Sequence, residues 1–141
     1  GVDGILVPDL PFEERDELLE ETKRYGVDLI YMVAPTSDDR IAHIAKEATG
    51  FLYVVSSLGV TGVRSEITTD VGSMVKKIRA VSDVPTAIGF GISTPKQAQD
   101  MAKVSDGAIV GSAIVRMIGE KGKDAIADVA SYVCTMKDAI R

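Results

Sequence analysis

The chain has 141 residues and a net charge of −5, and this length fits a single globular domain. Sixteen basic residues against twenty-one acidic ones argue against a nucleic-acid binder, whose phosphate-neutralising patch normally shows in the composition. Polar or charged residues interrupt every apolar run well short of ~18 residues, which excludes a membrane-spanning helix. We therefore expect residues 1–141 to belong to one structural unit.

Five short runs rich in β-branched and other apolar residues predict strands, at residues 4–7, 28–33, 51–55, 86–89 and 107–110. Their apolar character is too continuous for strands that are wetted on one face. Buried parallel strands have this pattern, because helices cover both of their faces.

Stretches of helical period separate these runs and predict helices over residues 11–25, 37–48, 71–78 and 94–102, a short one over 112–118 and a longer one from 124 onward. Thr94 followed by Pro95 is a typical N-cap and first helical residue. The fold class is therefore α/β with about five parallel βα units. Two architectures remain open: a doubly wound sheet, or an arc of an eight-stranded barrel without its first three units.

Glycines follow three successive predicted strands, in the segments Gly59–Gly62, Gly89–Gly91 and Gly111–Ser112. Glycine lets backbone N–H groups approach a ligand closely, and a helix N-terminus carries partial positive charge. In barrels the loops after the last two strands commonly bind phosphate. We therefore interpret the three turns as a phosphate site built from backbone amides and hydroxyls.

The other candidate residues are weaker candidates for a catalytic or metal-binding role. His43 lies in a predicted helix between apolar neighbours, which does not suit a catalytic role. Cys134 is expected to be a small core residue, and a single cysteine together with no visible signal peptide favours a reducing cytoplasm. Asp9 follows the first strand, where an N-cap is favoured over an acid or base. No metal cluster or nucleophile–base pair is visible in the sequence.

Five segments occur in an order that closely resembles the tryptophan synthase alpha subunit family: Val7–Glu14, Ala34–Ser37, Ser56–Gly62, Gly89–Ser93 and Val110–Val115. The resemblance extends over essentially the whole chain. It implies a (β/α)₈ TIM barrel, of which residues 1–141 would be the C-terminal part from the fourth strand to the end. The absence of an initiator methionine before Gly1 fits that expectation.

The resemblance implies retro-aldol cleavage of indole-3-glycerol phosphate to indole and glyceraldehyde 3-phosphate in tryptophan biosynthesis. It maps the phosphate site onto Gly62, Gly91, Gly111 and Ser112, and the substrate pocket onto Leu6, Pro8, Met32, Tyr53, Thr61 and Phe90. Thr61 resembles the residue that hydrogen-bonds the catalytic aspartate. Both catalytic carboxylates of the family come from the second strand and the loop after it, and Asp9 matches neither position.

The resemblance also implies that the alpha subunit needs no cofactor. Pyridoxal phosphate would belong to the beta subunit, its partner in a heterotetramer. Two alternatives remain: a non-catalytic half-barrel that binds a phosphate ligand or the beta subunit, and another phosphate-binding barrel enzyme such as an isomerase or aldolase. The candidate Schiff-base lysines lie in predicted helices, which disfavours an aldolase.

Overall fold

The computed structural model describes residues 1–35, 38–56 and 71–141. Its strands are β1 (Gly4–Leu6), β2 (Asp28–Ile30), β3 (Met32–Val33), β4 (Leu52–Val55), β5 (Thr86–Gly89) and β6 (Gly107–Ala108). The α-helices are α1 (Asp16–Arg24), α2 (Asp38–Glu47), α3 (Val71–Arg79), α4 (Pro95–Ala102), α5 (Ser112–Lys121) and α6 (Ile126–Ala139). Two 3₁₀ turns, η1 (Phe12–Glu14) and η2 (Gly122–Ala125), precede α1 and α6.

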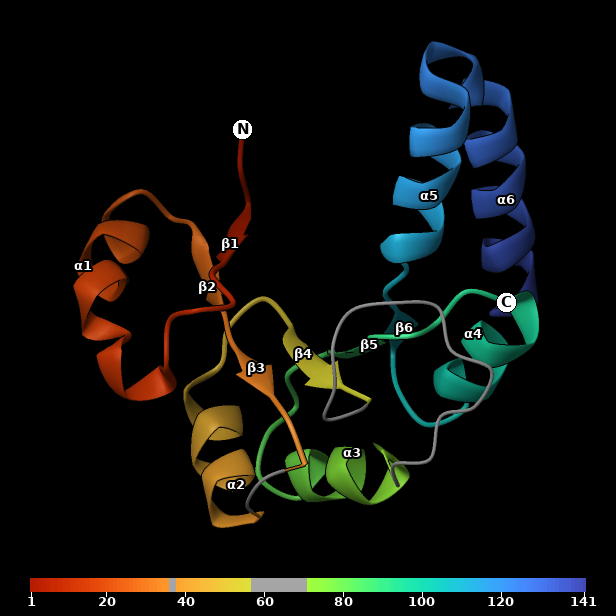
Figure 1. The fold of residues 1–141 in the computed structure, drawn as a ribbon. Coiled ribbons are helices and arrows are strands. Elements are labelled where there is room, and N and C mark those ends of the chain that lie inside the picture. The colour runs from red at the N-terminus through yellow and green to blue at the C-terminus, as the bar shows by residue number, and fades with distance from the viewer. Residues whose placement is uncertain (36–37, 57–70) are drawn as a thin grey trace.

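Among the described residues, each pairing is parallel and joins strands that are consecutive in the sequence, with a break between β2 and β3. One sheet has the order β1–β2 and the other β3–β4–β5–β6, and Figure 1 shows the strands following one another from β1 to β6. A doubly wound sheet would reverse its strand order at a switch point. The consecutive order therefore decides between the two predicted architectures, in favour of an arc of a barrel.

The predicted strand over residues 28–33 is divided at Tyr31. Its first half, β2, pairs with β1, and its second half, β3, pairs with β4. The Tyr31 carbonyl accepts a hydrogen bond from the Tyr53 amide at 3.0 Å. The division thus marks the point where the run changes its hydrogen-bonding partner from one neighbouring strand to the other.

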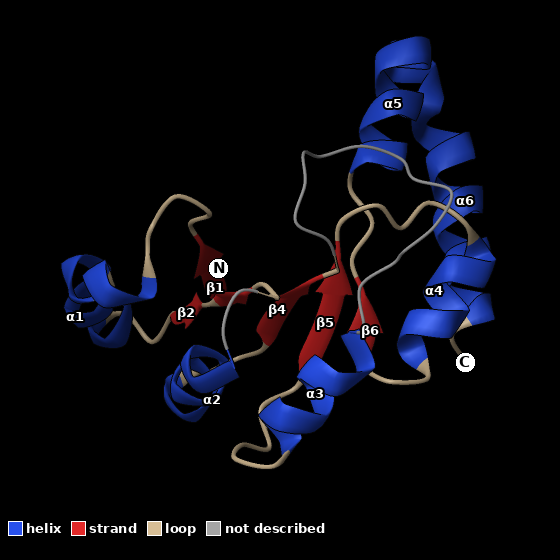
Figure 2. Cartoon of the chain, turned by 60° about the horizontal axis from the view of Figure 1, so that its bottom comes forward, coloured by secondary structure: helices blue, strands red, loops and turns tan. Residues whose placement is uncertain are grey.

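The core lies between the sheet and the helices on its outer side, where α2, α3 and α4 cover β4, β5 and β6 (Figure 2). Val33, Val54 and Ile88 are in register and at most 2% exposed. Buried side chains of α2 and α3 pack against this row, among them Ile41, Ile44, Val75 and Ile78. The next row, Met32, Tyr53, Ala87 and Gly107, lies on the opposite face and is only half buried.

The start of α4 is fixed by the capping residues that the sequence predicted. The Thr94 hydroxyl accepts a hydrogen bond from the Gln97 amide at 3.2 Å, and the Gln97 side chain in turn accepts one from the Thr94 amide at 3.1 Å. This reciprocal capping box satisfies two donors that would otherwise lack a partner at the helix start. The prediction of a cap at Thr94 with Pro95 as the first helical residue is confirmed.

The burial expected for Cys134 is wrong, because this residue is exposed rather than part of the core. Tyr25, which follows α1, is also 70% exposed. On α5 and α6, Val115 is 69% and Ile126 is 78% exposed, although α5 and α6 pack side by side (Figure 1). Within the described residues, none of the helices has the length and apolar character needed to cross a membrane.

Candidate functional site

A pocket of about 130 Å³ lies at the carboxyl ends of β4, β5 and β6. Parallel strands end at the same edge of their sheet, so the residues that follow them meet there. The lining combines two aromatic rings, two branched aliphatic side chains and a helix start: Tyr53, Phe90, Gly91, Ile92, Ile109, Gly111 and Ser112. We call it the β5–β6 pocket.

This pocket brings together five of the residues that the sequence singled out. Tyr53 and Phe90 were assigned to the apolar wall, whereas Gly91, Gly111 and Ser112 were assigned to the phosphate site. Ile92 and Ile109 also line the pocket, although the sequence did not indicate a binding role for either residue. The described part of the lining contains no Lys, Arg, Asp or Glu.

The aromatic wall is held by close packing across β4 and β5. The Tyr53 and Phe90 rings meet edge to face, with centroids 5.9 Å apart and planes at 77°. A Cβ on Gly89 would lie only 2.0 Å from the Tyr53 hydroxyl oxygen, so the tyrosine needs a glycine beneath it. Burial raises the pKa of the Tyr53 phenol, and a hydrogen bond with the Phe90 backbone opposes this in part.

The chain turns out of β5 through two residues with positive φ, Phe90 at 74° and Gly91 at 83°. Glycine adopts this conformation readily, whereas a bulky side chain such as that of Phe90 is strained there. Ser56, which is fully buried, holds the turn: its hydroxyl donates to the Phe90 carbonyl at 2.5 Å and its amide to the Gly89 carbonyl at 3.0 Å.

The other side of the pocket is the N-terminus of α5. Gly111 is the N-cap, and its carbonyl accepts hydrogen bonds from the amides of Ile114 and Val115. Gly111 has no side chain that could cap this end of the helix. A helix N-terminus presents backbone N–H donors and partial positive charge, a combination that suits an anion.

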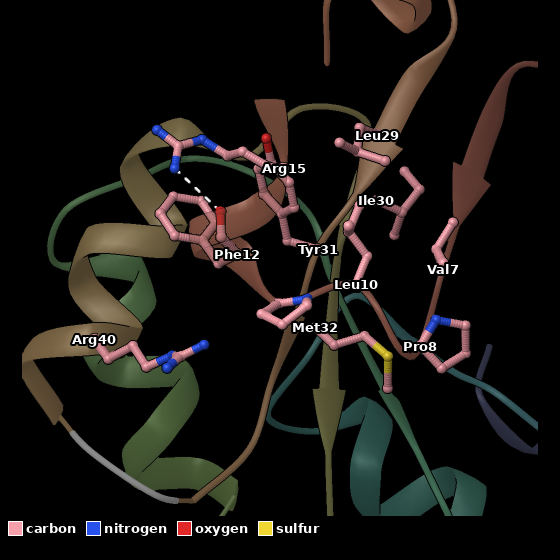
Figure 3. A pocket seen from close by; sticks show the side chains of 11 residues that line it. Val7, Pro8, Leu10, Phe12, Arg15, Leu29, Ile30, Tyr31, Met32 and Arg40 are labelled. Atoms are coloured by element: carbon pink, nitrogen blue, oxygen red, sulfur yellow. Dashed lines mark hydrogen bonds between the residues drawn. The ribbon is translucent and has the colours of Figure 1, made fainter. Parts of the chain in front are cut away.

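The remaining predicted wall residues lie elsewhere. Pro8 and Met32 line a second pocket of about 160 Å³, together with Phe12, Arg15 and Arg40 (Figure 3). Met32 is nevertheless in register with Tyr53 on the same face of the sheet. Leu6, at the end of β1, is half buried and lines neither pocket.

Two arginines of this second pocket are already engaged. The Arg15 guanidinium lies 4.1 Å over the Phe12 ring and donates to the Phe12 carbonyl at 3.1 Å, which Figure 3 marks with a dashed line. Arg40 pairs with Glu13 at 2.9 Å. Both therefore contribute to holding the turn η1 against the core.

Other candidates stand as follows. Thr61 and Gly62 lie outside the described residues. Asp9 is exposed, and the cap role favoured for it is wrong, because η1 has Pro11 as its N-cap and no side-chain cap. His43 is exposed and its ring packs edge to face on Phe12, with centroids 5.3 Å apart. Among the described residues no three His, Cys, Asp or Glu side chains gather as a metal site would require.

An arc of parallel βα units with a pocket at the carboxyl ends of its strands is part of a (β/α) barrel. The family model described as "Tryptophan synthase alpha chain" matches residues 1–141. The chain belongs to the tryptophan synthase alpha chain family.

Relatives and solved structures agree with this assignment. The chain is 46% identical to the alpha chain of Lacticaseibacillus casei over 140 residues and 51% identical to that of Lactiplantibacillus plantarum over 141, covering 99% of this chain and 53% of each relative. It is similar to Mycobacterium tuberculosis tryptophan synthase, with a TM-score of 0.84 and 32% identity over 100% of this chain and 52% of that one.

A structure of the tryptophan synthase α2β2 complex of Pyrococcus furiosus matches with a TM-score of 0.84 and 34% identity, over 98% of this chain and 56% of that one. The chain thus spans about half the length of the relatives it matches. Its fold is a partial (β/α)₈ TIM barrel.

Proposed function

We propose that this chain supplies the substrate-binding half of an alpha-chain lyase that cleaves indole-3-glycerol phosphate to indole and glyceraldehyde 3-phosphate. In this proposal residues 1–141 are the C-terminal part of a single barrel domain. The observation that carries it is the β5–β6 pocket, in which an aromatic wall and an open helix N-terminus face the same space. A substrate with an aromatic ring at one end and a phosphate at the other needs this combination.

The phosphate would be held by neutral donors. Gly91, Gly111 and Ser112 line the pocket, and the described lining offers no cation. The backbone amides of these residues would be the donors. Helix N-termini and glycine turns bind phosphate in this way because their N–H groups converge on the anion. The Ser112 hydroxyl would add one side-chain donor.

The indole would lie against Tyr53 and Phe90, with Met32 beside Tyr53 on the same face. Apolar walls of this kind exclude water and fix the ring by contact. A tyrosine phenol is protonated at neutral pH and burial raises the pKa of Tyr53 further, so the wall adds no negative charge near the phosphate. Pro8 and Leu6 do not line the β5–β6 pocket, and their place in the substrate pocket rests on the family resemblance alone.

Cleavage breaks the carbon–carbon bond between the indole ring and the glyceryl chain. An acid protonates the ring carbon, and a base takes the proton of the glyceryl hydroxyl, whose oxygen becomes the aldehyde of glyceraldehyde 3-phosphate. Paired carboxylates suit these two roles. We assign neither role to a residue of this chain, whose contribution is to bind and orient. The lyase step itself would use no cofactor.

The test is a chimera in which residues 1–141 replace the matching segment of the Lacticaseibacillus casei alpha chain. Release of indole from indole-3-glycerol phosphate is expected, and a Ser112→Pro change in the same chimera should weaken it by removing a first-turn amide. A folded chimera without indole release contradicts the proposal. Turnover of another sugar phosphate by the chimera would instead support the alternative of an aldolase or isomerase.

For the 141 residues tested alone we propose a second function, which is to bind a phosphate ligand or the beta subunit without catalysis. The observation that favours it is the absence of Asp and Glu from the described lining of the β5–β6 pocket. We expect the isolated chain to bind phosphate ligands and to release no indole. Binding to a tryptophan synthase beta subunit is proposed from the likeness to the Pyrococcus furiosus complex, and pull-down of a purified beta subunit would test it.

A further inference from the structure

We propose that Ser56 is a positioning residue that sets the geometry of the β5–β6 pocket by holding the strained turn at Phe90 and Gly91. The inference rests on the proposed function, because it concerns how the same pocket is shaped for a phosphate-bearing aromatic substrate. Ser56 does not line the pocket itself. It acts through the backbone of β5.

The first argument is the strain in the turn. Phe90 has a φ of 74°, a conformation that is strained for a residue other than glycine and that persists only when surrounding contacts impose it. The Ser56 hydroxyl supplies such a contact, since it donates to the carbonyl of the strained residue at 2.5 Å. The Ser56 amide holds the preceding carbonyl, that of Gly89, at 3.0 Å.

The second argument is that one peptide unit controls both halves of the pocket. The Phe90 side chain forms the aromatic wall with Tyr53, and the peptide that follows Phe90 carries the Gly91 amide. The carbonyl held by Ser56 belongs to that same peptide. A rotation there would move the ring and the Gly91 donor together.

The third argument is burial. Ser56 is 0% exposed, so water cannot easily replace its hydroxyl when the hydroxyl is removed. The Phe90 carbonyl would then lose this partner, and relaxation of the turn out of positive φ would relieve strain at the same time. We therefore expect the turn to relax when the hydroxyl is removed.

Ser105 offers a matched control. It is also buried, at 6% exposure, and its single hydroxyl proton lies within hydrogen-bond reach of two carbonyls, that of Met101 at 2.9 Å and that of Gly107 at 3.0 Å. Ser105 precedes β6 and so lies at the amino end of the sheet, away from the β5–β6 pocket. Like Ser56→Ala, Ser105→Ala removes one buried hydroxyl donor, and it leaves the turn at Phe90 and Gly91 unchanged.

The experiment titrates inorganic phosphate into the ¹⁵N-labelled chimera and follows the amide resonances of Gly91 and Ser112. Ser56→Ala should weaken phosphate binding by about fivefold, the equivalent of one hydrogen bond of roughly 1 kcal/mol, and should shift the Gly91 resonance before phosphate is added. Ser56→Cys keeps a weak donor, so its phosphate affinity should lie between those of wild type and Ser56→Ala. Ser105→Ala should change neither readout.

Phosphate affinity within a factor of two of wild type in Ser56→Ala would overturn the positioning role and leave the proposed function standing. An equal loss in Ser105→Ala would also overturn it, because the effect would then be one of general stability. If wild type itself shows no phosphate-dependent shift at Gly91 and Ser112, the proposed function fails, and the role of Ser56 in ligand binding fails with it.

Discussion

Replacing Gly89 with alanine tests whether close packing under Tyr53 shapes the aromatic wall. The new Cβ would lie 2.0 Å from the Tyr53 hydroxyl oxygen, 2.3 Å from Cζ and 2.7 Å from Cε1. All three separations are far below van der Waals contact, so the ring must move. Overpacking of this kind costs roughly 1–3 kcal/mol, and at about 3 °C per kcal/mol for a chain of this size the Tm should fall by roughly 3–9 °C.

The distances also predict which second change restores stability. Tyr53→Phe removes the nearest atom but leaves Cζ and Cε1 in place, so we expect Gly89→Ala and Tyr53→Phe to add within about 0.5 kcal/mol. Tyr53→Leu removes the ring, so Gly89→Ala should cost at least about 1 kcal/mol less in that background. Urea unfolding of the single and double variants measures both couplings. Gly107→Ala is the matched control, since its nearest neighbour would be the Ala87 Cβ at an ordinary 3.9 Å.

Two results would refute this reasoning. A Gly89→Ala variant with wild-type stability would mean that the ring has room to move. Strict additivity with Tyr53→Leu would mean that the cost arises from something other than the contact with the ring. In either case the claim that Gly89 is needed to position the aromatic wall would be withdrawn.

Three further predictions concern stability, pH and association. Thr94→Ala should destabilise the protein by about 1 kcal/mol through loss of the cap on α4, measured by urea unfolding, and Thr94→Ser should not. The pKa of the Asp106 carboxyl is lowered, first by the hydrogen bond from the Thr86 amide at 2.8 Å; the stability it adds is therefore present above its unfolded-state pKa and lost as the pH falls through the lower folded-state value. Asp106→Asn should flatten the acid limb of a plot of Tm against pH, and an unchanged limb would contradict this. Finally, Val115 and Ile126 are exposed, and β1 and β6 each have one edge that pairs with none of the described strands. We therefore expect the isolated chain to self-associate, and a sharp monomer with cooperative melting in light scattering and calorimetry would count against it.

Much of the fold could be read from local patterns in the sequence. The β-branched runs and the helical periods each depend on residues within one element, and the structure places strands and helices close to the predicted ranges. The cap at Thr94 is equally local, since it needs only the next three residues. Family membership also follows from ordered short motifs, and the match over residues 1–141 confirms it.

The grouping of candidate site residues was predictable in part. Glycine turns after successive strands indicated a ligand site at the carboxyl edge, because parallel strands end together, and Gly91, Gly111 and Ser112 do meet at one pocket. That these residues bind phosphate stays a prediction. Ser56 belongs to the motif Ser56–Gly62, but the sequence indicated no role for it. A serine that follows a strand carries no signal of what its hydroxyl will contact.

Only the tertiary structure decided the features that depend on distant residues. Consecutive strand order separated a barrel arc from a doubly wound sheet, and the change of partner at Tyr31 divided one predicted strand into β2 and β3. Cys134 proved exposed because helical period shows which residues share a face and not what covers that face. The hydrogen bond from Ser56 to Phe90 spans 34 residues: the sequence by itself determined the elements, and pairing between strands determined which residues act together.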